Sequence, residues 1–117
     1  MNTLRAVIIP SRSGSFFEAQ LLELDIAVSA MSVDELFSEI EHALIMEFHL
    51  ANKYGNVPFS AFLNRVPAEF EKMWASVGDD PIGVRDLNIP DDVAKALASA
   101  LRTGNMHVGV RAHRLAA

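Results

Sequence analysis

Three stretches near the N-terminus have the patterns of short β-strands. Residues 4–10 are rich in β-formers, and residues 16–24 alternate in part between apolar and polar positions. Turn-forming residues at 11–15 separate these two stretches, which predicts a β-hairpin with a longer loop. Residues 26–30 alternate again and predict a third strand. Because the gaps between the stretches are too short for helical crossovers, we expect an antiparallel meander in one sheet.

A long amphipathic helix is predicted over residues 32–53. Ser32 followed by Glu35 is the pattern of a capping box, and Met31 and Leu36 have the spacing of a hydrophobic staple. Apolar side chains then recur at three- and four-residue steps, which places them on one side of a helix. They are Val33, Leu36, Phe37, Ile40, Leu44, Phe48 and Ala51. We therefore expect this helix to cover one face of the sheet.

The second half of this helix is more apolar than one buried stripe requires. Residues 43–51 are apolar most of the way round the helix, so a second surface must cover them. One candidate is the segment that follows, which contains Phe59, Phe62 and Leu63. The other candidate is a second subunit or a different protein. In that case the interface residues would be Ile45, Met46 and His49.

Two shorter helices and a last strand are expected in the rest of the chain. Pro67 suits the first position of a short helix, and Asp91 or Asp92 suits the N-cap of another. The pattern at 82–89 fits either an irregular segment or a strand. Residues 106–112 alternate between apolar and polar positions and predict a final edge strand.

Together these elements predict an α+β fold, in which a three-stranded antiparallel β-meander packs on the long amphipathic helix and additional short helices follow. The length of 117 residues suits about one domain. A loop at 78–81 is the best candidate for an internal boundary. We therefore expect residues 1–80 to form a β-β-β-α module with extra helices. Residues 81–117 would form a C-terminal extension, either within the same domain or as a small appendage.

The composition is that of a globular chain, with 50% apolar and 21% charged residues. Cysteine is absent, which excludes disulfides, thiolate catalysis and zinc sites built on cysteine. It also suits a reducing compartment, so a cytoplasmic location is expected. No apolar run approaches the roughly 20 residues that span a bilayer, and no membrane role is expected.

Charge is distributed unevenly along the chain. Residues 1–80 hold five Lys or Arg against twelve Asp or Glu, a net charge of −7, which favours a basic partner. Residues 81–117 hold five Lys or Arg against three Asp, a net charge of +2. This small basic segment is the alternative candidate site, for nucleic acid. Its members are Arg102, His107, Arg111, His113 and Arg114.

Two stretches of the chain resemble the HicB-like antitoxin family. SFFEAQLLELDIAVSAMSVDEL is similar to the family's strand, short break and capped helix start, and DELFSEIEHALIMEF is similar to its helix of alternating acidic and apolar residues. The resemblance covers about the first half of the chain. It implies a truncated ribonuclease-H-like sheet without the nuclease carboxylates. It also implies a protein that oligomerises, binds a small basic toxin and carries a DNA-binding tail, as in toxin–antitoxin systems.

Candidate catalytic and metal-binding residues are few. The step from Glu39 to His42 can serve a metal in helical bundles, with His49 on roughly the same face, but no further ligands are placed for it. We therefore expect surface histidines. Asp79 and Asp80 are typical turn formers. The sequence contains no glycine-rich phosphate motif and no paired-cysteine zinc motif.

The predicted function is a non-catalytic protein-interaction module that requires no cofactor. The expected partners are further copies of the chain and a small basic protein. The alternative is a nucleic-acid-binding regulator that uses the basic C-terminal segment. A third hypothesis is a small-molecule site between the sheet and the later helices. Trp74, at helical spacing from Phe70, is expected to belong to the core.

Overall fold

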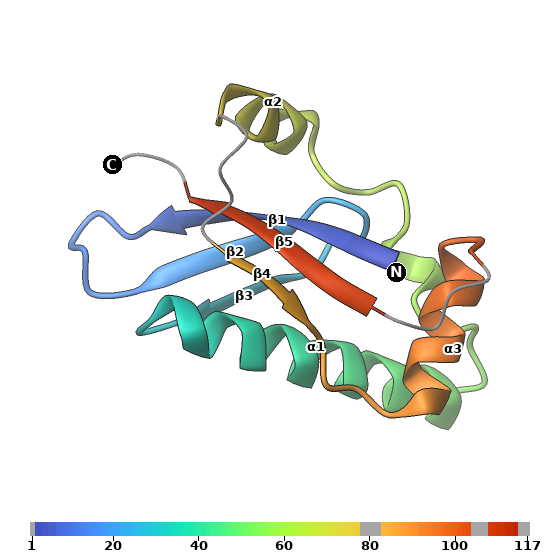
Figure 1. Ribbon diagram of the computed structural model, residues 1–117. Helices are drawn as coiled ribbons and strands as arrows, with labels where there is room; N and C mark the ends of the chain where they lie inside the picture. Colours follow the sequence, from blue (N-terminus) through green and yellow to red (C-terminus); the bar gives the residue numbers. More distant parts are fainter. Residues whose placement is uncertain (1, 78–82, 104–107, 115–117) are drawn as a thin grey trace.

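The computed structural model describes residues 2–77, 83–103 and 108–114, which form an α+β structure with one long helix (Figure 1). Its strands are β1 (Asn2–Pro10), β2 (Phe17–Leu21), β3 (Ala27–Ala30), β4 (Gly83–Asp86) and β5 (Val108–Arg114). Its helices are α1 (Val33–Lys53), α2 (Ala68–Ser76) and α3 (Asp91–Ala100), with a short 3₁₀ turn at Ser60–Phe62. The predicted α+β class and the predicted long helix are confirmed.

The described strands form one mixed sheet in the order β3-β2-β1-β5-β4. β1, β2 and β3 are antiparallel neighbours, as expected, but β1 also pairs in parallel with β5, and β4 pairs antiparallel with β5. The sheet therefore has more strands than the three that were predicted. The missing partner of β1 comes from the far end of the chain, and local patterns carry no information about such distant pairing.

The last predicted strand lies inside the sheet and not at its edge. β5 runs between β1 and β4, and all but two of its described residues are buried. Val108, Val110 and Ala112 join the apolar core on one face, whereas Arg111 and His113 lie on the other face. Polar residues on one face made the segment look like an edge strand. Residues 106 and 107 of the predicted strand lie outside the described residues.

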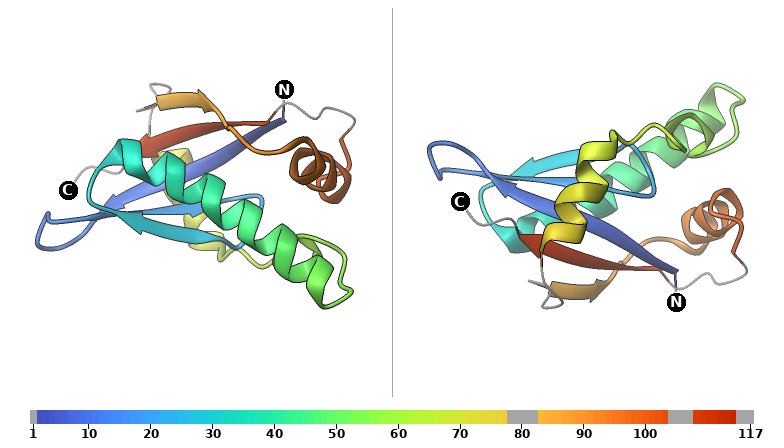
Figure 2. Two further views of the ribbon diagram at one scale, coloured as in Figure 1. Left: turned by 90° about the horizontal axis from the view of Figure 1, so that it is seen from below. Right: turned by 90° about the horizontal axis from the view of Figure 1, so that it is seen from above.

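α1 packs across one face of the sheet, over β2 and β3 (Figure 2). Leu36, Ile40 and Leu44 of its apolar stripe are fully buried. They meet the inward-facing side chains of the strands, and α3 closes the core at one end. The strand and α3 residues in this core include Leu4, Ala6, Ile8, Ala19, Leu21, Val108, Val110, Val93 and Leu97.

Ser32 caps the start of α1 as predicted, but within the described part of the chain neither the return bond of a capping box nor a staple with both residues buried is found. The Ser32 hydroxyl oxygen accepts a hydrogen bond from the backbone N–H of Glu35 at 3.2 Å. Leu36 is buried, but Met31 is 70% exposed, so the predicted contact between them is wrong. At the other end, Gly55 adopts the left-handed conformation (φ +71°) that follows many helices.

The two later helices begin at proline residues. Pro67 and Pro90 occupy the N-cap positions of α2 and α3. The predicted N-cap at Asp91 or Asp92 is wrong, because both residues lie inside the first turn of α3. There they are stabilised by the positive end of the helix dipole. Within the described ranges, none of the helices combines the length and the apolar character needed to cross a bilayer.

The segment after α1 covers part of the second apolar side of that helix. Phe59 is buried in the core, and Phe62 and Leu63 pack against it. The backbone carbonyl of Phe62 also accepts a hydrogen bond from the N–H of Asp25 at 2.9 Å, which fixes this segment to the turn between β2 and β3.

Candidate functional site

The face of the sheet opposite α1 carries polar residues and is crossed by α2 (Figure 2). Along β1 the core residues alternate with Thr3, Arg5 and Val7, which therefore lie on the α2 face. The parallel register places Arg5 opposite Arg111 and Val7 opposite His113. Two strands from opposite ends of the chain thus bring basic side chains to the same face.

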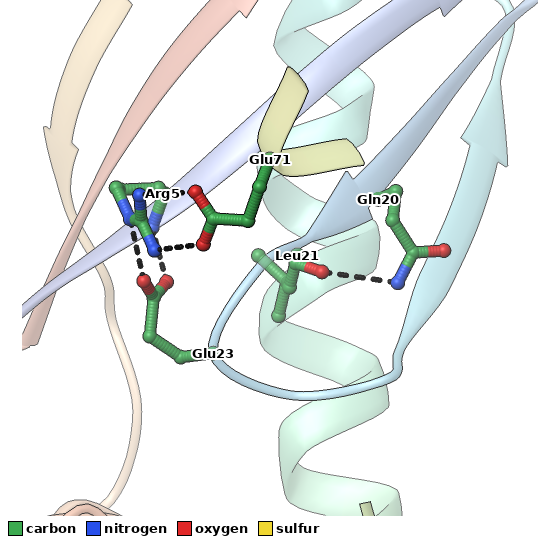
Figure 3. A network of polar contacts seen from close by, with 5 residues as sticks. All are labelled: Arg5, Gln20, Leu21, Glu23 and Glu71. Atoms are coloured by element: carbon green, nitrogen blue, oxygen red, sulfur yellow. Dashed lines mark hydrogen bonds and ion pairs between the residues drawn. The ribbon is translucent and has the colours of Figure 1, made fainter. Parts of the chain in front are cut away.

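Arg5 connects three elements of the structure (Figure 3). Its Nε donates a hydrogen bond to Glu23 at 2.7 Å, and its backbone N–H donates to the same carboxylate at 2.6 Å. Its two terminal nitrogens donate to Glu71 at 3.1 and 2.7 Å, in bidentate geometry. Because Glu23 lies in the turn after β2 and Glu71 lies in α2, this network fixes α2 to the central strand.

These contacts raise the pKa of the Arg5 guanidinium. The hydrogen bond with Glu71 is the largest cause; burial opposes it, and Glu23 adds to it. A folded-state pKa above the unfolded value stabilises the folded protein wherever the unfolded group is protonated. This contribution is therefore complete through neutral pH, and it is lost only as the pH rises through the raised pKa in strongly alkaline solution.

A groove of about 560 Å³ lies between α2 and the strand pair β1–β5, and we call it the α2 groove. Its polar and aromatic lining consists of Thr3, Arg5, Trp74, Arg111 and His113. The rings of Trp74 and His113 meet edge to face, with centroids 4.4 Å apart and an interplanar angle of 89°. Arg5 also lies 5.6 Å from the centre of the Trp74 ring. Trp74 is thus half-buried in a groove wall, and not a member of the apolar core.

The structure separates the basic C-terminal residues that the sequence grouped together. Arg111 and His113 line the α2 groove, but Arg114 lies on the opposite face, 5.1 Å from the centre of the Phe17 ring. Arg102 lies after α3 and lines a different hollow. His107 lies outside the described residues. The described members of this group therefore form no continuous basic track.

A second surface lies along the C-terminal half of α1. Met46, Leu50 and Tyr54 follow one another at four-residue steps and are 59%, 40% and 67% exposed. Val57, in the loop that follows, is 71% exposed. We call these four residues the apolar flank. Beside them is a hollow of about 480 Å³ whose lining includes Leu50, Tyr54, Val57, Phe59 and Phe62.

The residues that the sequence proposed for an interface have different positions. Met46 and His49 are exposed, whereas Ile45 is half-buried and packs against the core. The His49 ring lies edge to face with Phe48 of the same helix, at 5.4 Å between centroids. The sequence did not indicate Tyr54 as a surface residue. Its four-residue spacing from Leu50 was the available signal.

The two sides of α1 differ in their neighbours. On one side Asp34 forms an ion pair with Arg85 of β4, and Glu41 accepts a hydrogen bond from the backbone N–H of Asn88. Helical spacing places Met46 and Leu50 on the other side of the helix. β4 is one edge strand of the sheet, and β3 is the opposite edge strand (Figure 2).

Among the residues whose placement is described, no group of three or more His, Cys, Asp or Glu side chains could hold a metal ion. Glu39 and His42 approach to 3.9 Å as an exposed pair on one helix. Asp79 and Asp80 lie outside the described residues. Comparisons with models of known protein families, with curated proteins and with solved structures found no match to this chain.

Proposed function

We propose that this chain is a non-catalytic protein-interaction module that resembles the HicB-like antitoxins and binds other polypeptides through its apolar flank. The observation that carries this proposal is the exposure of four large apolar side chains next to one another, beside an apolar hollow. Contiguous exposed apolar patches on a folded protein usually mark a binding surface. The order of elements β1, β2, β3 and α1, which the resemblance implies, supports it.

The charges on α1 favour a basic partner. The helix carries five carboxylates and one lysine. Asp34 and Glu41 bind Arg85 and Asn88, but Glu35 and Glu39 are exposed on the same side of the helix as Met46. A complementary surface therefore presents cations next to apolar side chains. The small basic protein that the resemblance implies would supply the cations.

The same surface can also support assembly of the chain with itself. If a two-fold axis passes near Leu50, Met46 of one copy lies opposite Tyr54 of the next, as an isologous interface requires. The acidic residues near the start of α1 then diverge from the axis, and Glu47, which lines the hollow with Leu50, is the carboxylate of α1 that stays near it. Oligomerisation is therefore part of the proposal.

Light scattering coupled to size-exclusion chromatography tests the proposal. The chain is measured alone and after coexpression with the product of any short, basic reading frame adjacent to its gene. We expect a mass above the 12.8 kDa of one chain, and we expect Met46→Glu to return the chain to a folded monomer.

Met31→Glu is the matched control, because Met31 is also exposed but lies at the opposite end of α1. This variant should leave the mass unchanged. A wild-type chain that stays monomeric at every concentration and after coexpression would contradict the proposal. An assembly that Met46→Glu leaves intact would contradict the assignment of the apolar flank.

A further inference from the structure

We infer that the α2 groove binds a small molecule through an anionic group, either a carboxylate or a phosphate. This site does not depend on the apolar flank or on any protein partner. Its size of about 560 Å³ is that of a small-molecule site, for which about 300–1,000 Å³ is usual.

The first observation is the chemistry of the lining. Every polar side chain that lines the groove can donate hydrogen bonds: the Thr3 hydroxyl, the two guanidinium groups, the His113 imidazole and the Trp74 indole. Among the described residues that line it, none is Asp or Glu. Arg5 is already paired with Glu23 and Glu71, which lie outside the lining, so the groove is distinguished by its hydrogen-bond donors and not by a net positive charge. Such a lining favours a ligand group with several hydrogen-bond acceptors, as a carboxylate or a phosphate has.

The second observation is the state of His113. Its side chain is only 4% exposed, and its ring packs edge to face against Trp74. The imidazole lines the groove on one side and contacts the Trp74 ring on another. Buried polar side chains nearly always have a hydrogen-bond partner. Because the imidazole lines the groove, an anion bound there can accept a hydrogen bond from its ring N–H.

The third observation is that the donors are held in place before any ligand arrives. Glu23 and Glu71 fix the Arg5 side chain, and the Trp74 ring packs against His113. Arg111 projects from β5 two residues before His113, on the same face. A guanidinium has five N–H donors, so Arg111 can serve a ligand in addition to its other contacts. Preorganised donors lose little conformational entropy when they bind.

Intrinsic fluorescence provides a direct assay, because Trp74 is the only tryptophan in the chain. The wild-type chain is titrated with inorganic phosphate and with benzoate, against sodium chloride at equal ionic strength. We expect a saturable change with at least one of the two anions and none with chloride. The anion that saturates distinguishes a phosphate ligand from a carboxylate ligand. No saturable change with either anion up to about 10 mM would overturn the proposal.

Two variants and one matched control locate the binding site. Arg111→Gln removes a cation from the groove, and His113→Phe keeps the ring against Trp74 but removes the nitrogens. Each should weaken binding by about tenfold or more. Arg114→Gln removes the same charge from the same strand on the opposite face, and it should leave the affinity unchanged. Equal weakening by all three variants would show a general charge effect and overturn the assignment.

Two further measurements separate an anion site from a folding defect and from a nucleic-acid interface. Circular dichroism shows whether the variants fold. If they do not, the imidazole NMR signals of His113 in the wild-type chain must still shift when the anion is added. Unchanged His113 signals would contradict the site. A single-stranded oligonucleotide that changes the Trp74 signal at far lower concentration than either small anion would replace the proposal with a nucleic-acid interface.

Discussion

The two faces of the sheet are covered in different ways. On the α1 face, apolar side chains from β1, β2, β3 and β5 form one core with Leu36, Ile40 and Leu44, and these three helix residues are fully buried. On the α2 face, the covering helix has no fully buried residue. It is held by the ion pair between Arg5 and Glu71 and by the contact of Trp74 with His113, and Val7 of β1 is the fully buried apolar residue on this face of that strand. The Glu71 side chain is 54% exposed, so solvent screens its ion pair.

This difference has a functional consequence. Burial of apolar area contributes most of the stability of a fold, and it leaves no room for a ligand. Polar contacts at a partly exposed helix contribute less, but they can hold donors around an open groove. The α1 face therefore holds the apolar core, whereas the α2 face carries the open α2 groove.

The largest expected effect comes from a truncation in the α1 face. Leu44→Ala removes a fully buried side chain from the core and should lower the free energy of unfolding by about 2–5 kcal/mol. Urea denaturation monitored by circular dichroism measures this. Met31→Ala truncates an exposed side chain and should change stability by less than about 0.5 kcal/mol. Equal losses in the two variants would show that the α1 stripe is not the main core.

A smaller effect is expected at the α2 face. Arg5→Met removes the ion pairs to Glu23 and Glu71, which are partly exposed, and should cost about 1–2 kcal/mol of unfolding free energy. Glu69→Gln, which removes a charge from the same helix, should cost less than about 0.5 kcal/mol. A loss at Arg5 as large as that of Leu44→Ala would remove the distinction between the faces.

The N-cap of α1 should contribute to the free energy of unfolding by the amount that is usual for a helix N-cap. Ser32→Ala removes the acceptor for the N–H of Glu35 and should cost about 1 kcal/mol in the same denaturation experiment. Ser38→Ala, at an exposed position in the second turn of the same helix, should be neutral or slightly stabilising because alanine favours helices. A neutral Ser32→Ala would show that the cap has no energetic role.

The smallest effect on stability is expected at the apolar flank. Met46→Glu changes an exposed side chain and should shift the unfolding free energy of the monomer by less than about 0.5 kcal/mol. Ile45→Glu, by contrast, places a charge on the half-buried side next to the core and should destabilise the monomer clearly. Denaturation at low protein concentration separates the two. Strong destabilisation by Met46→Glu would place this residue in the core.

Local patterns account for what the sequence predicted correctly. The period of the apolar residues in α1 and the cap at Ser32 depend on neighbours within a few positions, so they were visible in the sequence. The meander of β1, β2 and β3 was visible for the same reason, because its connections are short. The predicted end of this helix at residue 53 is likewise confirmed.

The α2 groove depends on contacts between distant parts of the chain. β1 and β5 come from opposite ends of the sequence, and α2 comes from between them. The alternation of Thr3 and Arg5 with core residues indicates a polar face, but it does not show which strand lies beside β1. Trp74 was assigned to the core because helical spacing alone cannot distinguish a core residue from a groove wall.

Native-state hydrogen exchange tests the difference between the two faces most directly. We expect the amides of α1 and the central strands to exchange only through global unfolding, and those of α2 to exchange through a local opening of lower free energy. Arg5→Met should accelerate exchange in α2 more than in α1. If α2 and α1 exchange with the same free energy, and Arg5→Met affects both equally, the α2 face is part of the stabilising core and the proposed division between the faces is wrong.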